Sequence, residues 1–446
     1  MHVFSRGAGL RPRGLNMNYQ ESLKYLNSFI NYEKTPPKSH AELNLLRMRH
    51  GLDVLGHPEK NFFPILITGT VGKGSTGYFL EQILESSKIS TGFYHSPHID
   101  DIRERIRVRG EMLSEKKWSV AVTEIQKLLH KNPFPKKLGS PTFFEMLTLL
   151  AIWIYAKEGL RVGIFEIGMG GRLDATNVLE APLCIITKID FDHQAFLGNT
   201  LTKIAHEKAG IIKSACFVVS APQAQEAMNV FEALVAAPVL GAKRRGLIPA
   251  VSPSTKLIIS KATSSQPGLA GEFQKQNAGN AVAAAEILAE HFDFRISKKN
   301  IREGLKQKNW FGRVELGRWG KREILMDAAH NIAGCRELTD AISRMKKKPQ
   351  YLLFSALKDK QSADMLKVLS QLDIPIIVMP LSHVRSKNLA DLAAEAESFF
   401  DQVIPAKNSA HALEILEKIA KPAERVLVTG SFYLLGEMRK ILNPNI

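Results

Sequence analysis

An apolar run, a glycine-rich turn and a helical pattern follow one another directly in this chain. The run Pro64–Thr68 has the length and apolar character of a buried parallel strand. The turn Gly69–Ser75 follows, and apolar residues then recur at helical spacing from Phe79. Glycines allow backbone N–H groups to turn toward an anion, and a helix N-terminus adds positive potential. This order therefore predicts an α/β fold with a phosphate-binding loop.

Two side chains of the turn suit a nucleoside triphosphate. Lys73 can neutralise charge on the β- and γ-phosphates, and the Ser75 hydroxyl can bind Mg²⁺. The general pattern G-x-x-x-x-G-K-[ST] is not met, because residue 67 is isoleucine and Gly74 follows the lysine. A glycine-rich turn without a ligand is the alternative interpretation.

A carboxylate and a histidine follow two further apolar runs. Glu166 lies near the end of the run Val162–Ile167, where a charge is costly unless it is paired or bound to a metal. It is a candidate metal ligand, and the alternative is an ion pair with an arginine such as Arg172. His193 follows the run Leu183–Lys188 and is a second candidate ligand, although a lone histidine is more often a hydrogen-bonded structural residue.

Other polar residues depend more on their context. Lys208 lies in an amphipathic helical pattern that ends near Gly210, and by itself this predicts a solvated surface lysine. Arg313, Asp327 and His330 lie near an expected domain boundary, where ligand clefts are common. They offer donors and acceptors for ribose, phosphate or an amino acid. The alternative is a helix start at which Asp327 is the cap.

Short apolar runs alternate with helical patterns in two series, as in sheets covered by helices. Between residues 238 and 272 the composition shifts to Ser, Thr, Pro, Gly and Lys, which predicts irregular surface structure with one or two short strands. We therefore predict a disordered tail over residues 1–16, a first domain over 17–310 and a second over 311–446. The runs of the second series are Ile324–Asp327, Tyr351–Ser355, Ile374–Met379 and Val426–Thr429.

Composition narrows the function classes. Of the 446 residues, 45% are hydrophobic and 23% charged, which excludes disordered, collagen-like and coiled-coil proteins. The formal net charge of +16 suits nucleotides, nucleic acid or polycarboxylates. Three widely spaced cysteines favour a reducing cytoplasm. The apolar stretch Met146–Ala156 is too short for a membrane span, which needs about 20 residues, and predicts a core helix.

Taken together, these segments make the chain resemble the folylpolyglutamate synthase and dihydrofolate synthase family of the Mur-ligase superfamily, over about residues 18–440. The resemblance implies an N-terminal P-loop ATPase domain with a parallel sheet and a C-terminal Rossmann-like α/β domain that binds glutamate. The segments that carry it are ITGTVGKGST, SPHIDDIRERIRVRG, PTFFEMLTLLA, EIGMGGRLDATN, KIDFDHQAFLGNTLTKIAHEKAGIIK, QKQNAGNA, WFGRVE, DAAHN and VLVTGSFYLLGEM.

The resemblance also implies site residues, with ATP in the cleft between the domains. Lys208 matches a lysine that becomes carbamylated in such ligases. The triphosphate would be held by Gly72, Lys73, Gly74, Ser75 and Thr76, and the adenosine by Asn277, Arg313, Asp327 and His330. Mg²⁺ would be held by Ser75, Glu166 and His193, and the catalytic residues would be Lys73, Lys208, Glu166 and His193.

The implied activity is an ATP-dependent ligase that adds L-glutamate to dihydropteroate, to reduced folates or to both, through an acyl phosphate. The partners would be these small molecules and ATP, for a cytoplasmic monomer that binds neither nucleic acid nor membrane. One alternative is a Mur-type ligase with a different carboxylate substrate. Another is a nucleic-acid-stimulated P-loop ATPase, which only the basic charge supports.

Overall fold

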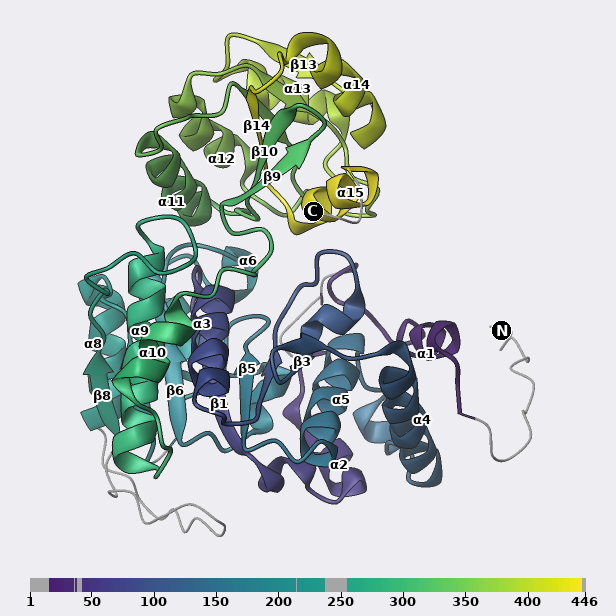
Figure 1. The fold of residues 1–446 in the computed structure, drawn as a ribbon. Helices are drawn as coiled ribbons and strands as arrows, with labels where there is room; N and C mark the ends of the chain where they lie inside the picture. Colours follow the sequence, from purple (N-terminus) through teal and green to yellow (C-terminus); the bar gives the residue numbers. More distant parts are fainter. Residues whose placement is uncertain (1–15, 36, 38–41, 214, 237–254, 443–446) are drawn as a thin grey trace, which may run out of the picture.

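The computed structural model describes residues 16–35, 37, 42–213, 215–236 and 255–442. These residues form two lobes, each a sheet covered by helices (Figure 1). The predicted tail over residues 1–16 lies outside the described residues, apart from Asn16. The segment of shifted composition is described only from Thr255 onward.

The sheet of the first lobe has the order β4-β3-β2-β5-β1-β6-β7-β8. Strands β2, β5, β1, β6, β7 and β8 are parallel, and β3 and β4 extend the β2 edge antiparallel. The central strand β1 is buried after its first residue, as expected for a strand with helices on both faces. The strands are β1 (Phe63–Thr68), β2 (Thr91–Tyr94), β3 (Ile106–Val108), β4 (Glu111–Met112), β5 (Val162–Glu166), β6 (Leu183–Ile186), β7 (Phe217–Ser220) and β8 (Lys256–Ile259).

The side chains of β1 alternate between two helical layers. Ile65 and Ile67 pack into the core cluster of α3, α9 and α10, whereas Leu66 packs into that of α2, α4 and α5. These two groups of helices lie on opposite sides of the sheet in Figure 1. The bounds are α1 (Tyr19–Leu26), α2 (Leu45–Leu55), α3 (Lys73–Ser86), α4 (Glu115–Lys131), α5 (Phe143–Lys157), α6 (Gln194–Leu197), α7 (Leu201–Ala209), α8 (Gln225–Ala236), α9 (Gln274–His291) and α10 (Lys298–Leu305).

The sheet of the second lobe has the order β13-β12-β11-β14-β10-β9, in which only the edge strand β9 is antiparallel. Leu325 of β10 packs with α11, α12 and α13, and its neighbour Ile324 packs with α14 and α15. The strands are β9 (Glu315–Trp319), β10 (Arg322–Met326), β11 (Tyr351–Phe354), β12 (Ile376–Val378), β13 (Val403–Pro405) and β14 (Arg425–Thr429). The helices are α11 (Ile332–Ser343), α12 (Ser362–Leu369), α13 (Leu389–Glu397), α14 (Ser409–Ile419) and α15 (Phe432–Leu442).

The chain changes lobes between α10 and β9. Trp310 of this connection packs into the first lobe, with its ring stacked on Tyr78 at 5.0 Å and on Phe93 at 5.7 Å between centroids. Two residues later Gly312 has a φ of +67°, and its carbonyl accepts a hydrogen bond of 3.0 Å from the backbone N–H of Ala328 in the second lobe. The passage from one lobe to the other therefore takes only a few residues, near position 311.

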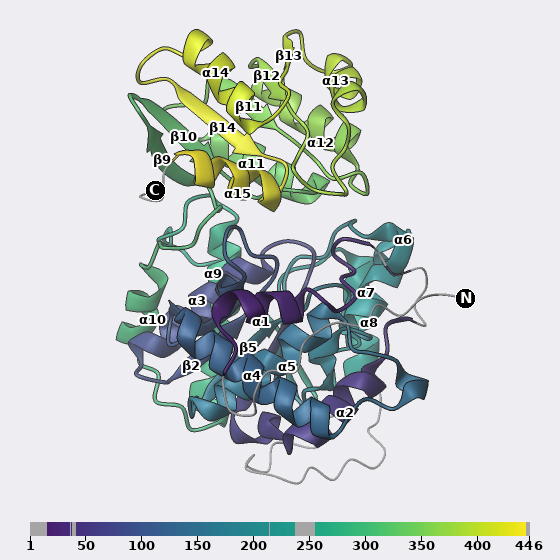
Figure 2. The ribbon, with the colours of Figure 1, turned by 90° about the vertical axis from the view of Figure 1, so that its right-hand side faces the viewer.

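The predicted α/β fold class is confirmed, and the predicted runs correspond to β1, β5, β6, β10, β11, β12 and β14. The apolar stretch predicted as a core helix lies within α5. No helix in the described ranges is long and apolar enough to cross a membrane. Figure 2 shows the second lobe stacked above the first, so that the face where the two lobes meet is the place to look for a site.

Candidate active site

The two lobes share a cavity of about 660 Å³. From the first lobe it is lined by the loops after β1, β5 and β6, and from the second by the loops after β10, β11 and β14. Ligands of parallel α/β sheets bind at these carboxyl ends of the strands. The strands therefore place the polar segments of both lobes around a common space.

The glycine-rich loop after β1 is close-packed and leaves a helix N-terminus open. Gly72 has a φ of +87° and is the N-cap of α3, with no side chain bonded to the first N–H groups of the helix. A Cβ atom at Gly72 would lie 2.1 Å from Oδ1 of Asn277, so only glycine fits there. Free N–H groups at a helix N-terminus are suited to a phosphate.

Two lysines meet at one carbonyl group of this loop. The Gly69 carbonyl accepts hydrogen bonds from Nζ of Lys208 at 2.7 Å and from Nζ of Lys73 at 3.2 Å. Lys208 is only 5% exposed. Burial, followed by the charge of Lys73, lowers the pKa of Lys208 from 10.5 to about 7. The expectation of a solvated surface lysine, which came from the helical pattern alone, is therefore wrong.

Glu166 is buried at the end of β5 and faces cations of both lobes. Burial raises its pKa to about 7, and the charges of Lys73 and Arg313 oppose this rise. A Cβ atom at Gly74 would lie 3.5 Å from both Oε2 of Glu166 and Nη2 of Arg313, which places the two groups beside the start of α3. Arg172, the alternative partner suggested by the sequence, pairs with Glu207 instead.

Residues of α9 hold the hydroxyl groups that follow the loop. Ser75 is 2% exposed, and its Oγ accepts a hydrogen bond of 3.3 Å from Nε2 of Gln274. The Thr76 hydroxyl donates to the Asn277 carbonyl at 3.3 Å. Thr76 is fully buried and does not line the cavity, whereas Ser75 does. The sequence analysis did not single out Gln274.

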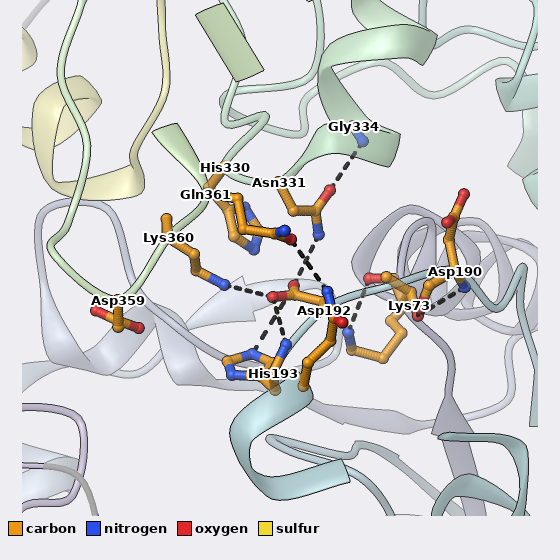
Figure 3. Close-up of polar contacts among 12 residues, drawn as sticks. Lys73, Asp190, Asp192, His193, His330, Asn331, Gly334, Asp359, Lys360 and Gln361 are labelled. Carbon is orange, nitrogen blue, oxygen red and sulfur yellow. Dashed lines mark hydrogen bonds and ion pairs between the residues drawn. The ribbon is translucent and has the colours of Figure 1, made fainter. Parts of the chain in front are cut away.

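A loop after β6 brings Asp192 and His193 to the cleft (Figure 3). His193 has a φ of +50°, and its backbone N–H donates to Oδ1 of Asp192 at 2.8 Å. Asp192 also accepts hydrogen bonds from two residues of the second lobe, Lys360 and Asn331, each at 2.8 Å. Sequence analysis identified His193 but did not single out Asp192 or Lys360.

Arg313, Asp327 and His330 come together at the base of the second lobe. Asp327 accepts hydrogen bonds from the backbone N–H groups of Val314 at 2.9 Å and Ala329 at 2.8 Å, and burial raises its pKa against the charge of Arg313. Nδ1 of His330 lies 2.8 Å from the Ala328 carbonyl.

The helix cap suggested for Asp327 is provided by a different residue. The side chain of Asn331, at the N-cap of α11, accepts a hydrogen bond of 2.8 Å from the backbone N–H of Gly334. Asp327 instead joins the segment just before β9, next to Arg313, to the loop that follows β10 through its two backbone partners.

The cavity thus collects most of the residues expected from the sequence, and their roles remain predictions. Within the described part of the chain, no group of three or more His, Cys, Asp or Glu side chains could hold a metal by itself. The expected site residues that line the cavity are Gly72, Lys73, Gly74, Ser75, Glu166, His193, Lys208, Asn277, Arg313, Asp327 and His330.

Comparison with known proteins agrees with this arrangement. The family model described as "Mur ligase, glutamate ligase domain" matches residues 312–432. A dihydrofolate synthase/folylpolyglutamate synthase of Bacillus subtilis is 32% identical over 440 residues, which cover 95% of this chain and 99% of that protein.

Two solved structures are similar over nearly the whole chain. Mycobacterium tuberculosis folylpolyglutamate synthase complexed with ADP has a TM-score of 0.82 at 25% identity, over 96% of this chain and 98% of that one. Escherichia coli FolC in complex with DHPP and ADP has a TM-score of 0.77 at 25% identity, over 95% and 97% respectively. The chain therefore belongs to the dihydrofolate synthase/folylpolyglutamate synthase family of ATP-dependent, amide-forming ligases.

Proposed function

We propose that this protein joins L-glutamate to the carboxylate of dihydropteroate, of a reduced folate or of both, and converts ATP to ADP and phosphate. The observation that carries the proposal is the shared cavity, in which the open helix N-terminus and Lys73 of the first lobe face Arg313 of the second. The ADP and DHPP named for the similar structures support a nucleotide and a second ligand in such a cleft.

The chemistry needs two steps, because a carboxylate is a poor electrophile. A carboxylate oxygen of the pterin substrate attacks the γ-phosphorus of ATP, the bond to ADP breaks, and an acyl phosphate forms. The free-base amine of glutamate then attacks the acyl carbon and loses a proton as phosphate leaves. Lys73 would balance charge on the transferring phosphoryl group, and removal of such a group commonly reduces the rate about 100- to 1000-fold.

The residues of the cavity fit a bound Mg²⁺ ion. Mg²⁺ typically takes one or two protein oxygens and keeps water and substrate phosphates as its other ligands. The Ser75 hydroxyl and the Glu166 carboxylate are such oxygens on the cavity wall, and His193 would act directly or through water. Burial raises the pKa of Glu166 to about 7 despite the charges of Lys73 and Arg313, so a further cation beside it would favour its charged form. The bound ion would supply positive charge to the phosphates.

We assign Lys208 as the lysine that becomes carbamylated. Its pKa of about 7 leaves a large neutral fraction at neutral pH. The neutral amine can attack carbon dioxide, with loss of one proton, and the product is a carbamate anion. Lys208 lies beside Lys73, and as a cation it would repel that lysine. As a carbamate anion it would attract Lys73 instead. Lys208→Ala should lose amide formation, and small carboxylates should partly restore it.

Mass spectrometry of the products tests the function. The protein is incubated with Mg·ATP, L-glutamate and either dihydropteroate or tetrahydrofolate, and the mass gain of one glutamyl unit is measured on each. Gain on either substrate supports the proposal and assigns the substrate. No gain on either, with ATP bound, would refute it. Because one chain provides all the residues invoked, we also expect a monomer in size-exclusion chromatography.

A further inference from the structure

At Asp192 the two lobes contact each other beside the site. Its Oδ1 accepts from Nζ of Lys360 and its Oδ2 from Nδ2 of Asn331, each at 2.8 Å (Figure 3). Both donors belong to the second lobe, and Asp192 belongs to the first. We infer that Lys360 and Asn331 form a latch with Asp192, which holds the lobes together and sets the position of His193. Lys360 is thus a positioning residue for the proposed reaction.

The ion pair of the latch is largely buried. The side chains of Lys360 and Asp192 are 9% and 12% exposed, although they come from different lobes. Exposed ion pairs contribute little to stability. Loss of one partner of a buried pair is costly, because it leaves an uncompensated buried charge. Both oxygens of Asp192 are occupied, so opening of the lobes would remove both hydrogen-bond donors of the second lobe from its carboxylate at once.

Asp192 also controls the backbone of the next residue. The same Oδ1 that binds Lys360 accepts a hydrogen bond of 2.8 Å from the backbone N–H of His193. His193 has the left-handed φ of +50°, a conformation that needs support from its surroundings. The contact with Lys360 therefore reaches His193 through a shared carboxylate oxygen.

The second contact of the latch, between Asn331 and Asp192, lies next to the part of the cavity proposed to bind the nucleotide. Asn331 binds Asp192 through Nδ2 and, through Oδ1, caps α11 at the Gly334 N–H, also at 2.8 Å. Asn331 directly follows His330, which lines the cavity. One amide side chain thus ties the start of α11 and His330 to Asp192 across the cleft.

A neighbouring contact provides a matched control. Nε2 of Gln194 donates to Oε1 of Gln361 at 3.2 Å, so this hydrogen bond also crosses between the lobes. It is solvent-exposed and neutral, and Gln361 is adjacent to Lys360 in the chain. If the latch depends on the buried charge, Gln361→Ala should leave the distance between the lobes nearly unchanged.

The inference rests on the proposed function, and its test has one readout that does not depend on activity. Spin labels are attached after Lys203→Cys and Asp364→Cys, at exposed positions of α7 and α12. Double electron–electron resonance then measures the distance between the lobes in the full chain. Lys360→Met should lengthen and broaden the distance distribution, whereas Lys360→Arg and Gln361→Ala should resemble the parent protein.

Kinetics provide the second readout. A displacement of about 1 Å can reduce a rate about 100-fold, so we expect Lys360→Met to lower kcat about 10- to 100-fold. Lys360→Arg should recover most of this loss. Asp192→Asn should share the defect, and the double variant should be little worse than either single variant.

Several outcomes would overturn the latch. One is an unchanged distance distribution in Lys360→Met. Another is an increase in KM for glutamate alone, with kcat and the distance unchanged, which would mean that Lys360 acts on substrate only. Additive losses in the double variant would also overturn it. If the parent protein forms no glutamyl product, the proposed function fails, and the distance measurement still decides the latch.

Discussion

Replacement of Lys208 by methionine should stabilise the folded protein while it removes activity. Methionine has a similar length and no charge, so the change removes a cation that is only 5% exposed. The Gly69 carbonyl keeps a partner after the change, because Lys73 also donates to it at 3.2 Å. The buried position therefore loses a charge without leaving a carbonyl group unpaired.

The size of the effect follows from the pKa of Lys208. The folded-state pKa is about 7, against 10.5 for the ordinary side chain. Each unit of difference is equivalent to about 1.4 kcal/mol, so the cost of the buried lysine approaches about 5 kcal/mol below pH 7. Because the folded-state pKa is the lower one, this cost shrinks as pH rises from 7 and disappears above 10.5. At pH 7.5 it is still about 4 kcal/mol.

Thermal unfolding between pH 7 and 10 tests this reasoning, in buffer freed of carbon dioxide so that the amine stays unmodified. Lys208→Met should melt about 5 °C or more above the parent at pH 7, and the difference should fall steadily toward pH 10. Lys203→Met, at an exposed position of the same helix, should show little difference at any pH. A Lys208→Met difference that is independent of pH, or a variant less stable throughout, would refute the buried-cation argument.

Three further predictions concern the phosphate side of the cavity. Lys73→Ala should abolish ADP formation while the circular dichroism spectrum stays unchanged, and full turnover would contradict its assignment. The pKa of about 7 for Glu166 predicts that the ADP-forming rate falls as pH drops below 7, because the acid becomes protonated. Added Mg²⁺ should shift this fall in rate to lower pH. Glu166→Gln should eliminate the shift that depends on Mg²⁺. Gly72→Ala should weaken nucleotide binding and lower the free energy of unfolding by more than the roughly 1 kcal/mol expected from positive φ alone, because its Cβ would meet Asn277 at 2.1 Å. Gly56→Ala is the control for the backbone effect, because Gly56 has a φ of +76° and open space around it. Equal losses of stability in the two variants would argue against the clash.

Local features were the ones that the sequence predicted well. The glycine-rich loop is local, because strand, turn and helix are contiguous and glycine is needed where φ is positive at Gly72. The position of Glu166 at a strand end followed from the same reasoning. The strand Thr91–Tyr94 was missed, because its sequence TGFY begins with threonine and glycine and so shows no continuous apolar run.

Features that depend on distant packing were not predictable. The ion pair between Asp192 and Lys360 joins residues 168 positions apart. The sequence pattern of neither segment indicates that the two lie together. The alternative pairing of Glu166 with Arg172 is not found, because the chain turns at Gly170, where φ is +66°, and carries Arg172 to Glu207 at 2.8 Å. Neighbours in sequence were thus separated by one turn.

The stacked Trp310 ties the connection between the lobes to the first lobe. Its ring stacks on Tyr78 and Phe93, and Tyr78 belongs to α3, the helix that begins at the glycine-rich loop. From Gly312 onward the backbone is bonded to the second lobe. The connection between the lobes is therefore anchored to the same helix that follows the glycine-rich loop. A rotation of the second lobe about this point would move Arg313, which lies next to it, less than residues that lie farther away.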